Sequence, residues 1–463
     1  MGDIMKTKNI FLLGASLLPL ASCAPPLAKP QTSVAVSEYL PHQKPVSGVV
    51  KANWWQIFNN PALNALEVDG LRANYDIAQA QDNLLAAQAT GRAANGAYLP
   101  QLSINPNATR QTQSSGPTSS PPYTIYQIQG QLSYDPGLFG ARHYTYQNSA
   151  AQVAYQAAEL GAARQTVAGN IAQAAIALAG DEAEIKTTEG IIAADQNLLN
   201  LLQGEYADGA IAQLDVLRQQ STILAEQATL PPLQTAAQQQ RDRLAVLTGK
   251  LPSDFTQANL KLSGFNLPGD VPAVLPSTYL KNRPDIQAAL AQVAAQNAAL
   301  GIAVAHLYPD LTLSADGGYA AETFNTMFNT TSAIWTLAGN LLAPIYNGGT
   351  LHAHKRAAQA QLAQALAAYH GAVLGAFSQA ADALTAVQNS RVALQRAHEA
   401  AQTATQAYKL SAEQYALGAV DYTTVLTAQT AASQAQLSEA QAQTQLLADI
   451  STLESAMAPV AKL

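Results

Sequence analysis

The hydrophobic pattern of the chain changes its period at two places. Over residues 280–300 apolar side chains recur at helical spacing, and Pro284 suits the first turn of the predicted helix. After Pro309 apolar and polar residues alternate over residues 311–319, as in a strand with one apolar and one polar face. The pattern therefore predicts a helix that leads directly into a strand.

The same change of period occurs earlier in the chain. A helical pattern gives way to alternation at Pro100, and Pro100 precedes Pro309 by 209 positions. The same offset separates Tyr206 from Tyr415, and each tyrosine is followed three residues later by a glycine. We interpret this regularity as an internal duplication, with two copies of one long unit.

Each copy is predicted to contain a β-hairpin. The first hairpin covers about residues 101–135 around a polar loop at 114–122, and the second covers about 310–342. Each strand has about 10 residues, which is enough to cross a bilayer when tilted. Membrane barrels need at least about 8 strands and tolerate no open edge in lipid, so four strands per chain predict an oligomer.

The rest of the pattern is helical, and apolar residues continue at helical spacing from Leu66 to Leu85. Residues 143–205 contain no proline, and one continuous helix there would be about 90 Å long. A second long pair of helices is expected, from about 352 to 415 and from 421 to 457. Pro231 and Pro232 are predicted to end one helix and start another. Abundant alanine permits close helix packing.

The N-terminus carries the signature of an exported protein. Residues 1–22 have a basic start and a short apolar run, too short for a mature transmembrane helix, which predicts a signal peptide. The segment ends in Leu-Ala-Ser-Cys, which resembles a bacterial lipobox and predicts acylation of Cys23, the only cysteine. The alternative is an ordinary signal peptide with an incidental cysteine. Residues 23–52 are expected to form the acylated tether.

Composition narrows the class of function. The 463 residues carry a net charge of -7 and no basic run, which argues against a nucleic-acid partner. We expect a first structural repeat at residues 53–250, a connector at 251–276, a second repeat at 277–458 and a tail at 459–463.

The sequence offers little for catalysis. It has no Gly-rich phosphate loop and no pair of carboxylates in a Gly-punctuated stretch, so neither an enzyme nor a cofactor is expected. His352 and His354 are an alternative metal pair, but their spacing beside two basic residues favours a solvated helix start. Trp54 and Trp55 suit carbohydrate stacking or, as we favour, a packed helix entry.

Several segments together carry a family resemblance. They are Trp54-Trp55-Gln56-Ile57-Phe58, Arg283-Pro284-Asp285-Ile286, and the stretches 230–233, 244–249 and 301–309. In this order they resemble the TolC-like outer-membrane efflux family, and specifically its lipoprotein branch that serves RND-type tripartite pumps. The likeness covers roughly residues 20–458. The chain departs from that branch at Leu290, where glutamate is frequent.

The resemblance implies a mainly α protein with a membrane β-barrel. The expected assembly is a homotrimer whose twelve-stranded barrel lies in the outer membrane and continues as a long periplasmic helical barrel. Its partners would be a periplasmic membrane-fusion adaptor, an RND-type inner-membrane pump and outer-membrane lipid. The chain would be a passive exit duct for drugs or other small solutes. The alternatives are a structural or adhesive coiled-coil lipoprotein and an outlet for type I protein secretion.

The resemblance also places two helix turns at a periplasmic tip that closes at rest. The expected tip or gate residues are Tyr206, Asp208, Gly209, Asp215, Tyr415, Gly418, Asp421, Thr424 and Thr427. Thr427 stands where many relatives carry an aspartate, so hydrogen bonds and packing are expected to hold this tip more than a ring of negative charge. Arg283, Pro284 and Asp285 are expected to form a structural motif.

Overall fold

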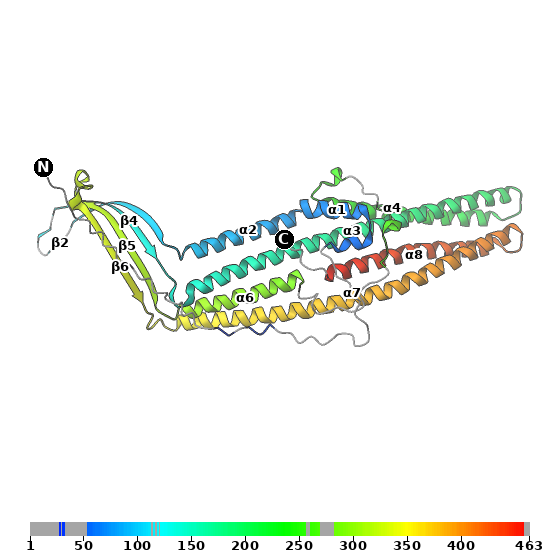
Figure 1. The fold of residues 1–463 in the computed structure, drawn as a ribbon. Coiled ribbons are helices and arrows are strands. Elements are labelled where there is room, and N and C mark those ends of the chain that lie inside the picture. Colours follow the sequence, from blue (N-terminus) through cyan, green and yellow to red (C-terminus); the bar gives the residue numbers. More distant parts are fainter. Residues whose placement is uncertain are drawn as a thin grey trace, which may run out of the picture. The chain divides into compact units, whose positions relative to one another are not determined.

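The computed structural model describes residues 27–28, 30–32, 53–112, 114–115, 118–119, 121–255, 260–268 and 282–457. In these residues the chain is mainly helical and contains a four-stranded sheet (Figure 1). The predicted signal peptide, Cys23 and the tail at 459–463 lie outside the described residues, as does most of the predicted tether.

The chain divides into two compact units. Among the described residues, the first comprises Ala89–Ala151 and Ala294–Gln364 together with residues 27, 28 and 30, and it contains the sheet. The second comprises Gln31–Gln88, Gln152–Val293 and Ala365–Leu463, and its described part is helical apart from short connections.

The sheet of the first unit is built from the two predicted hairpins. Its strands are β1 (Gln101–Gln111), β4 (Tyr123–Tyr134), β5 (Asp310–Ala321) and β6 (Ala333–Leu342), in the order β1-β4-β5-β6 and all antiparallel. A small ladder of β2 (Ser114–Ser115) and β3 (Thr118–Ser119) lies in the first loop. Figure 1 shows the long strands side by side. The outer edges of β1 and β6 have no partner strand within the described chain.

The central pairing of β4 with β5 joins the two copies of the duplication. Leu132 lies opposite Ala315, and Gln129 lies opposite Gly318. A Cβ at Gly318 would be 2.0 Å from the carbonyl oxygen of Ile128, so the close approach of the two backbones requires glycine there.

Neither face of the sheet is covered by a core. On β1, Leu102 and Ile104 are 74% and 67% exposed, although their alternation with polar residues predicted one apolar face. Trp335 and Leu337 on β6 are 81% and 76% exposed. A strand face with this much apolar surface requires an apolar environment, which this chain does not supply among its described residues.

The helices account for most of the second unit and for a smaller part of the first. They are α1 (Pro61–Ala73), α2 (Tyr75–Gly96), α3 (Ala141–Ala207), α4 (Gln213–Leu247), α6 (Pro284–Ala305), α7 (Thr350–Ala416) and α8 (Tyr422–Met457). Short 3-10 helices are η1 (Trp54–Phe58), η2 (Leu138–Gly140), η3 (Pro252–Asp254), η4 (Leu262–Gly264), η5 (Phe324–Thr326) and η6 (Thr330–Ser332). The two longest, α3 and α7, have 67 residues each, which confirms the long helices that the sequence predicted.

The predicted helix boundary at Pro231 and Pro232 is wrong. Both prolines lie inside α4, which continues from Gln213 to Leu247. A proline lacks the N–H that would bond four residues back, so the carbonyls of Gln227 and Ala228 lose their helical partners. These residues and both prolines are exposed, so water can take the place of the missing hydrogen bonds.

The helical pattern from Leu66 to Leu85 is interrupted at one residue. Asn74 separates α1 from α2, with an extended ψ of 132°. Its Oδ1 accepts hydrogen bonds from the backbone N–H groups of Asp76 and Ile77, and its Nδ2 donates to the carbonyl of Leu247 at 3.0 Å. The side chain thus starts α2 and ties this junction to the end of α4.

The core of the second unit gathers apolar side chains from most of its helices. Its largest fully buried members include Phe58, Leu63, Ile171, Ile176, Leu178, Leu244, Leu447, Ile450 and Leu453. Trp54 and Trp55 belong to this core, are 3% and 5% exposed, and meet edge to face. Their rings are therefore packed, as favoured above, and offer no face for carbohydrate stacking.

Helix α6 is long and apolar enough to cross a membrane by length and composition alone. In the first unit it packs against the beginning of α3. A Cβ at Gly301 would be 2.3 Å from the ring of Tyr144, and Asn148 Nδ2 donates to the carbonyl of Ala295 at 2.8 Å. The apolar character of this part of α6 thus serves close helix packing.

Candidate functional site

The candidate site lies at two equivalent helix turns of the second unit, between α3 and α4 and between α7 and α8. In the first, Gly209 N–H bonds to the Tyr206 carbonyl and Ala210 N–H to the Glu205 carbonyl, at 3.0 and 2.8 Å. In the second, Gly418 N–H bonds to the Tyr415 carbonyl at 2.8 Å, and Ala419 N–H bonds five residues back at 2.9 Å. Both helices therefore end in the same Schellman motif.

Glycine is required at both turns by backbone conformation. Gly209 and Gly418 have φ of 74° and 73°, in the left-handed region that an L side chain rarely adopts. A Cβ at either position would meet nothing within 4 Å. The constraint is thus the conformation that reverses the chain, and it is the same in both copies of the duplication.

Tyr415 connects the two helix pairs. Its Oη on α7 donates a 2.5 Å hydrogen bond to Glu205 Oε2 at the end of α3. Burial and this hydrogen bond to a carboxylate raise the pKa of Tyr415 far above its ordinary value, so the phenol stays protonated and remains a donor. The contact is charge-assisted, which makes it stronger than a bond between neutral groups.

A second link runs deeper between the same helix pairs. Tyr422 Oη on α8 donates a 2.5 Å hydrogen bond to Gln219 Oε1 on α4. Gln219 is fully buried, and its Nε2 donates at 3.1 Å to the backbone carbonyl of Asp195 on α3. Burial, followed by the charges of Asp195 and Asp215, raises the pKa of Tyr422 to about 12. The chain of hydrogen bonds thus crosses from α8 through α4 to α3.

Apolar packing surrounds these links. Leu199, Leu202, Val216, Ile223 and Tyr422 form a buried cluster, against which Ile211, Tyr415 and Leu426 pack. The rings of Tyr415 and Tyr422 meet edge to face at 6.4 Å. The packing of the two rings therefore positions the tyrosine hydroxyls, in addition to their hydrogen-bond partners.

The acidic residues expected at the tip make local contacts. Asp215 lies 3.6 Å from Arg218 on the same helix, one turn away. Asp421 Oδ1 accepts from the N–H and the hydroxyl of Thr424 at 2.9 and 2.7 Å, and so caps the start of α8. The hydrogen bonds from Thr424 and Thr423 lower the pKa of Asp421. Neither acid bridges two helices in the described structure.

The other expected tip residues are exposed. Tyr206 is 45% exposed, and Asp208 is exposed at the first turn. Thr427 is exposed, and its hydroxyl donates to the carbonyl of Thr423 one turn earlier. Thr424 is also exposed apart from its contact with Asp421. The structure thus brings Tyr415 into an interhelical contact and leaves these residues at the surface of the turns.

Sequence reasoning missed four residues of this region: Glu205, Gln219, Tyr422 and Asp195. Their side chains or backbones form the contacts between helices, whereas the sequence pattern favours residues nearest the glycines. One available signal was Gln219, a polar residue in the stretch of α4 that contains Val216 and Ile223. A polar residue on an apolar helix face requires a buried partner.

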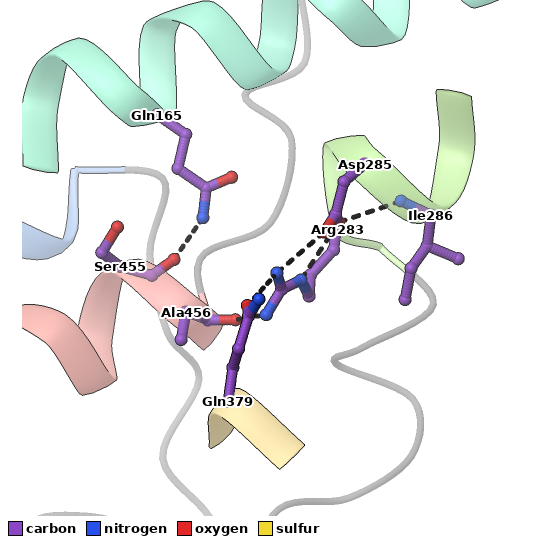
Figure 2. Close-up of polar contacts among 7 residues, drawn as sticks. All are labelled: Gln165, Arg283, Asp285, Ile286, Gln379, Ser455 and Ala456. Carbon is purple, nitrogen blue, oxygen red and sulfur yellow. Dashed lines mark hydrogen bonds and ion pairs between the residues drawn. The ribbon is translucent and has the colours of Figure 1, made fainter. Parts of the chain in front are cut away.

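The Arg283 motif lies elsewhere in the second unit (Figure 2). The guanidinium of Arg283, 7% exposed, forms a two-pronged contact with Asp285 at 2.8 and 3.1 Å. It also donates to Gln379 Oε1 on α7 and to the carbonyl of Ala456 at the end of α8. Asp285 Oδ1 accepts from Ile286 N–H at the start of α6. One side chain thus joins three helix segments and caps the last turn of α8.

In the part of the chain that the structure describes, no group of three or more His, Cys, Asp or Glu side chains is arranged to hold a metal ion. His352 and His354 lie in the first turns of α7.

The comparisons with known proteins fit this architecture. The model of the outer membrane efflux protein family matches residues 68–250 and 275–458. The chain is 27% identical over 378 residues to the pyoverdine export outer membrane protein OpmQ of Pseudomonas putida, covering 80% of this chain and 78% of that protein. It is 28% identical over 396 residues to the probable efflux pump outer membrane protein TtgC of Pseudomonas putida, covering 82% and 81%.

A solved structure is similar over nearly its whole length. The outer membrane protein VceC of Vibrio cholerae superposes with a TM-score of 0.82 at 25% identity, covering 89% of this chain and 99% of VceC. The chain belongs to the outer membrane efflux protein family. It is an outer-membrane efflux channel and not an enzyme, and the paired family matches confirm the duplication predicted from the sequence.

Proposed function

We propose that three copies of the chain assemble into one channel with a twelve-stranded barrel. The observation that carries this proposal is the sheet itself, in which β1 and β6 leave open edges and apolar residues such as Trp335 and Leu337 are exposed. Open edges are not tolerated in lipid, so β6 of one protomer pairs with β1 of the next. The homotrimer, rather than another ring size, rests on the resemblance to the TolC-like family.

The long helices of the three protomers would then form the periplasmic part of the duct. Its turns at Gly209 and Gly418 would meet a periplasmic membrane-fusion adaptor and, through it, an RND-type inner-membrane pump. The similar proteins support export of small solutes, since one is named for pyoverdine export and another for an efflux pump. The chain would use no energy itself, because the pump drives the transport.

The turns would close the duct at rest. Tyr415–Glu205 and Tyr422–Gln219 support this role because each bond joins the α7–α8 pair to the α3–α4 pair. Opening the tip would separate these pairs and break both links. The exposed Tyr206, Asp208, Asp421, Thr424 and Thr427 side chains and the partly exposed Asp215 would line the mouth and would not hold it closed.

The N-terminal proposals follow from the sequence. Residues 1–22 would be removed as a lipoprotein signal, and acylated Cys23 would anchor the tether of residues 23–52 in outer-membrane lipid. We retain the proposed first repeat at 53–250, the connector at 251–276 and the second repeat at 277–458.

The decisive experiment joins the two open edges. Cysteines would be placed at Ser103 on β1 and at a series of β6 positions centred on Asn340, in a background in which Cys23→Ala is combined with an ordinary signal-peptide cleavage site. Oxidation of outer membranes should give covalent dimers and trimers, and native mass spectrometry should show three chains. A single chain, or a different ring size, would contradict the proposal, and the same cysteine at Ser263 in the connector serves as the non-edge control.

A planar-bilayer recording separates the proposal from its main alternative. Purified trimer should conduct ions, whereas an adhesive coiled-coil lipoprotein should give no channel.

A further inference from the structure

A cavity of about 850 Å³ lies inside the second unit, away from the two turns. Its walls come from α3, α7 and α8, and the segment with Leu260 and Leu262 contributes a further side. Ala183, Ile191 and Ala432 add apolar surface. The volume is within the range of small-molecule sites, and the lining combines this apolar surface with polar and charged side chains, among them Glu182, Lys186, Lys261 and Glu439.

Two buried polar side chains that line this cavity have atoms without a hydrogen-bond partner among the described residues. Asp195 on α3 is 1% exposed, and its Oδ1 accepts no hydrogen bond among the described residues. Gln429 on α8 is 4% exposed, and neither its Oε1 nor its Nε2 has a partner there. Both residues line the cavity. Buried polar groups are nearly always hydrogen-bonded, so the two oxygens, Asp195 Oδ1 and Gln429 Oε1, point to an occupant that supplies donors.

The electrostatics at this end of the cavity favour a cation. The charge that acts on Asp195 among the described residues is a second acid, Glu226, and the Tyr408 hydroxyl lies close enough to be affected by Asp195. Burial, and then Glu226, raise the pKa of Asp195 to about 6, so the carboxyl is largely ionised above neutral pH. The cavity also contains Lys186 and Lys261, but neither pairs with Asp195 in the described structure. A buried carboxylate without a cationic partner is costly, and a bound cation removes that cost.

We propose that this cavity binds an organic ammonium cation, with the ammonium between Asp195 and Gln429 and the hydrocarbon part against Ala183, Ile191 and Ala432. The carboxylate oxygen and the Gln429 Oε1 accept hydrogen bonds from the N–H groups. A metal ion fits less well, because no group of three or more His, Cys, Asp or Glu side chains among the described residues is arranged to hold one. An apolar body with a single positive end matches both parts of the lining.

The site goes beyond the proposed function, because its lining comes from a single chain and from one compact unit. Binding there requires neither the trimer nor the closed tip. Its position between α3 and α8 nevertheless adjoins the Tyr422–Gln219–Asp195 connection, since Asp195 takes part in both. Occupancy would stiffen the contact between the two helix pairs.

The test uses the purified full-length channel and a defined probe. Para-fluorophenethylammonium is titrated at mildly alkaline pH and followed by fluorine NMR, with para-fluorophenylethanol as the neutral probe of the same shape. The ammonium should bind saturably. The alcohol should bind more weakly by about tenfold or more, because it lacks the charge-assisted hydrogen bond. Asp195→Asn and Gln429→Leu, which preserve side-chain size, should each weaken ammonium binding by about tenfold.

The matched control is Asp82→Asn, which neutralises an exposed acid on α2 away from the cavity and should leave the affinity unchanged. Equal affinity for the ammonium and the alcohol, or undiminished binding by Asp195→Asn, would overturn the proposal. Absence of saturable binding to the folded wild-type channel would also overturn the proposal and would indicate that the cavity holds only water. Size-exclusion chromatography and circular dichroism of each variant establish that it is folded. Conductance is recorded in a separate experiment, so that failure of the channel proposal can be distinguished from failure of the binding proposal.

Discussion

The hydroxyl of Tyr415 donates to the carboxylate of Glu205 at 2.5 Å, although the two residues are 210 positions apart in the chain. The contact joins the ends of the two longest helices, immediately before the turns that reverse them. Each helix belongs to a different copy of the duplication. This hydrogen bond is therefore present when the two helix pairs are together and is broken when they move apart. It is therefore the first place to test the proposed gate.

Tyr415→Phe should raise the resting conductance of purified trimers in planar bilayers. The ring contact with Tyr422 is kept, but the hydrogen bond to Glu205 is lost, which costs about 1.5–3 kcal/mol for a charged partner. The closed state should become less populated by about tenfold or more. Tyr75→Phe, at an exposed tyrosine of α2, is the control. Resting conductance like that of the wild type would remove Tyr415 from the gate.

Asp215→Ala and Asp421→Asn should have smaller effects than the loss of Tyr415. Asp215 pairs with Arg218 on its own helix and Asp421 caps α8, so neither change breaks a contact between helix pairs. Asp215→Ala should open the channel only partly, and Asp421→Asn should alter cation preference modestly. Reversal potentials in asymmetric salt measure the preference. An open channel in Asp421→Asn would show that charge, rather than hydrogen bonding, keeps the tip closed.

The buried side chain of Glu67 should make the stability of the fold depend on pH. Its side chain in α1 is fully buried, neither oxygen has a partner among the described residues, and burial raises its pKa from 4.5 to about 9. The folded state binds this proton more tightly than the unfolded state. The resulting stabilisation is fully present below pH 4.5 and is lost as the pH rises toward about 9.

Glu67→Gln should therefore become more stable relative to the wild type as the pH rises over that interval, by up to about 1.4 kcal/mol per pH unit. Thermal unfolding midpoints of both proteins across the interval provide the measurement. Asp82→Asn, at an exposed position, should show no such trend. A difference between Glu67→Gln and wild type that is independent of pH would mean that Glu67 is solvated in the folded channel.

Arg283→Ala should destabilise the helical unit by about 2–3 kcal/mol. The change removes the partner of Gln379 and of the Ala456 carbonyl, whereas Asp285, with a side chain 47% exposed, can be hydrated. Arg283→Lys should retain part of the stability, because lysine keeps the charge but not the planar fork. Denaturant unfolding followed by circular dichroism gives both values.

The control for this prediction is Arg396→Ala. That arginine is 72% exposed in its pair with Glu399, and such surface pairs contribute little to stability. Equal losses of unfolding free energy in the two alanine variants would show that the Arg283 motif does not stabilise the contact between helices.

Cys23→Ala, combined with an ordinary signal-peptide cleavage site, should remain trimeric in the outer membrane at reduced yield. In the proposed assembly a lipidated Cys23 would add only a supplementary anchor, because the barrel would insert by itself. Membrane fractionation and native mass spectrometry test this expectation. Recovery of the variant as a soluble periplasmic protein would argue against the barrel.

The hairpins and long helices were predictable because the period of a hydrophobic pattern is a local property. Residues 311–319 alternate whether or not the strand has a neighbour, and the glycines at 209 and 418 require a left-handed turn in any surroundings. Pro231 and Pro232 were misjudged because the cost of a proline in a helix depends on whether water reaches the carbonyls one turn earlier. The local sequence does not determine whether water reaches those carbonyls.

The sequence by itself determined the duplication, the hairpins and the paired turns, since each depends on spacing along the chain, while the class of channel was indicated by the resemblance of its motifs to a known family. Only the tertiary structure decided which polar side chains meet, Tyr415 with Glu205 and Tyr422 with Gln219, and that Asp195 and Gln429 line one cavity. Partners across packed helices are set by the axial shift and rotation of one helix against another. A displacement of one residue turns a side chain by about 100° on a helix of 3.6 residues per turn, so the local pattern leaves those pairings undetermined.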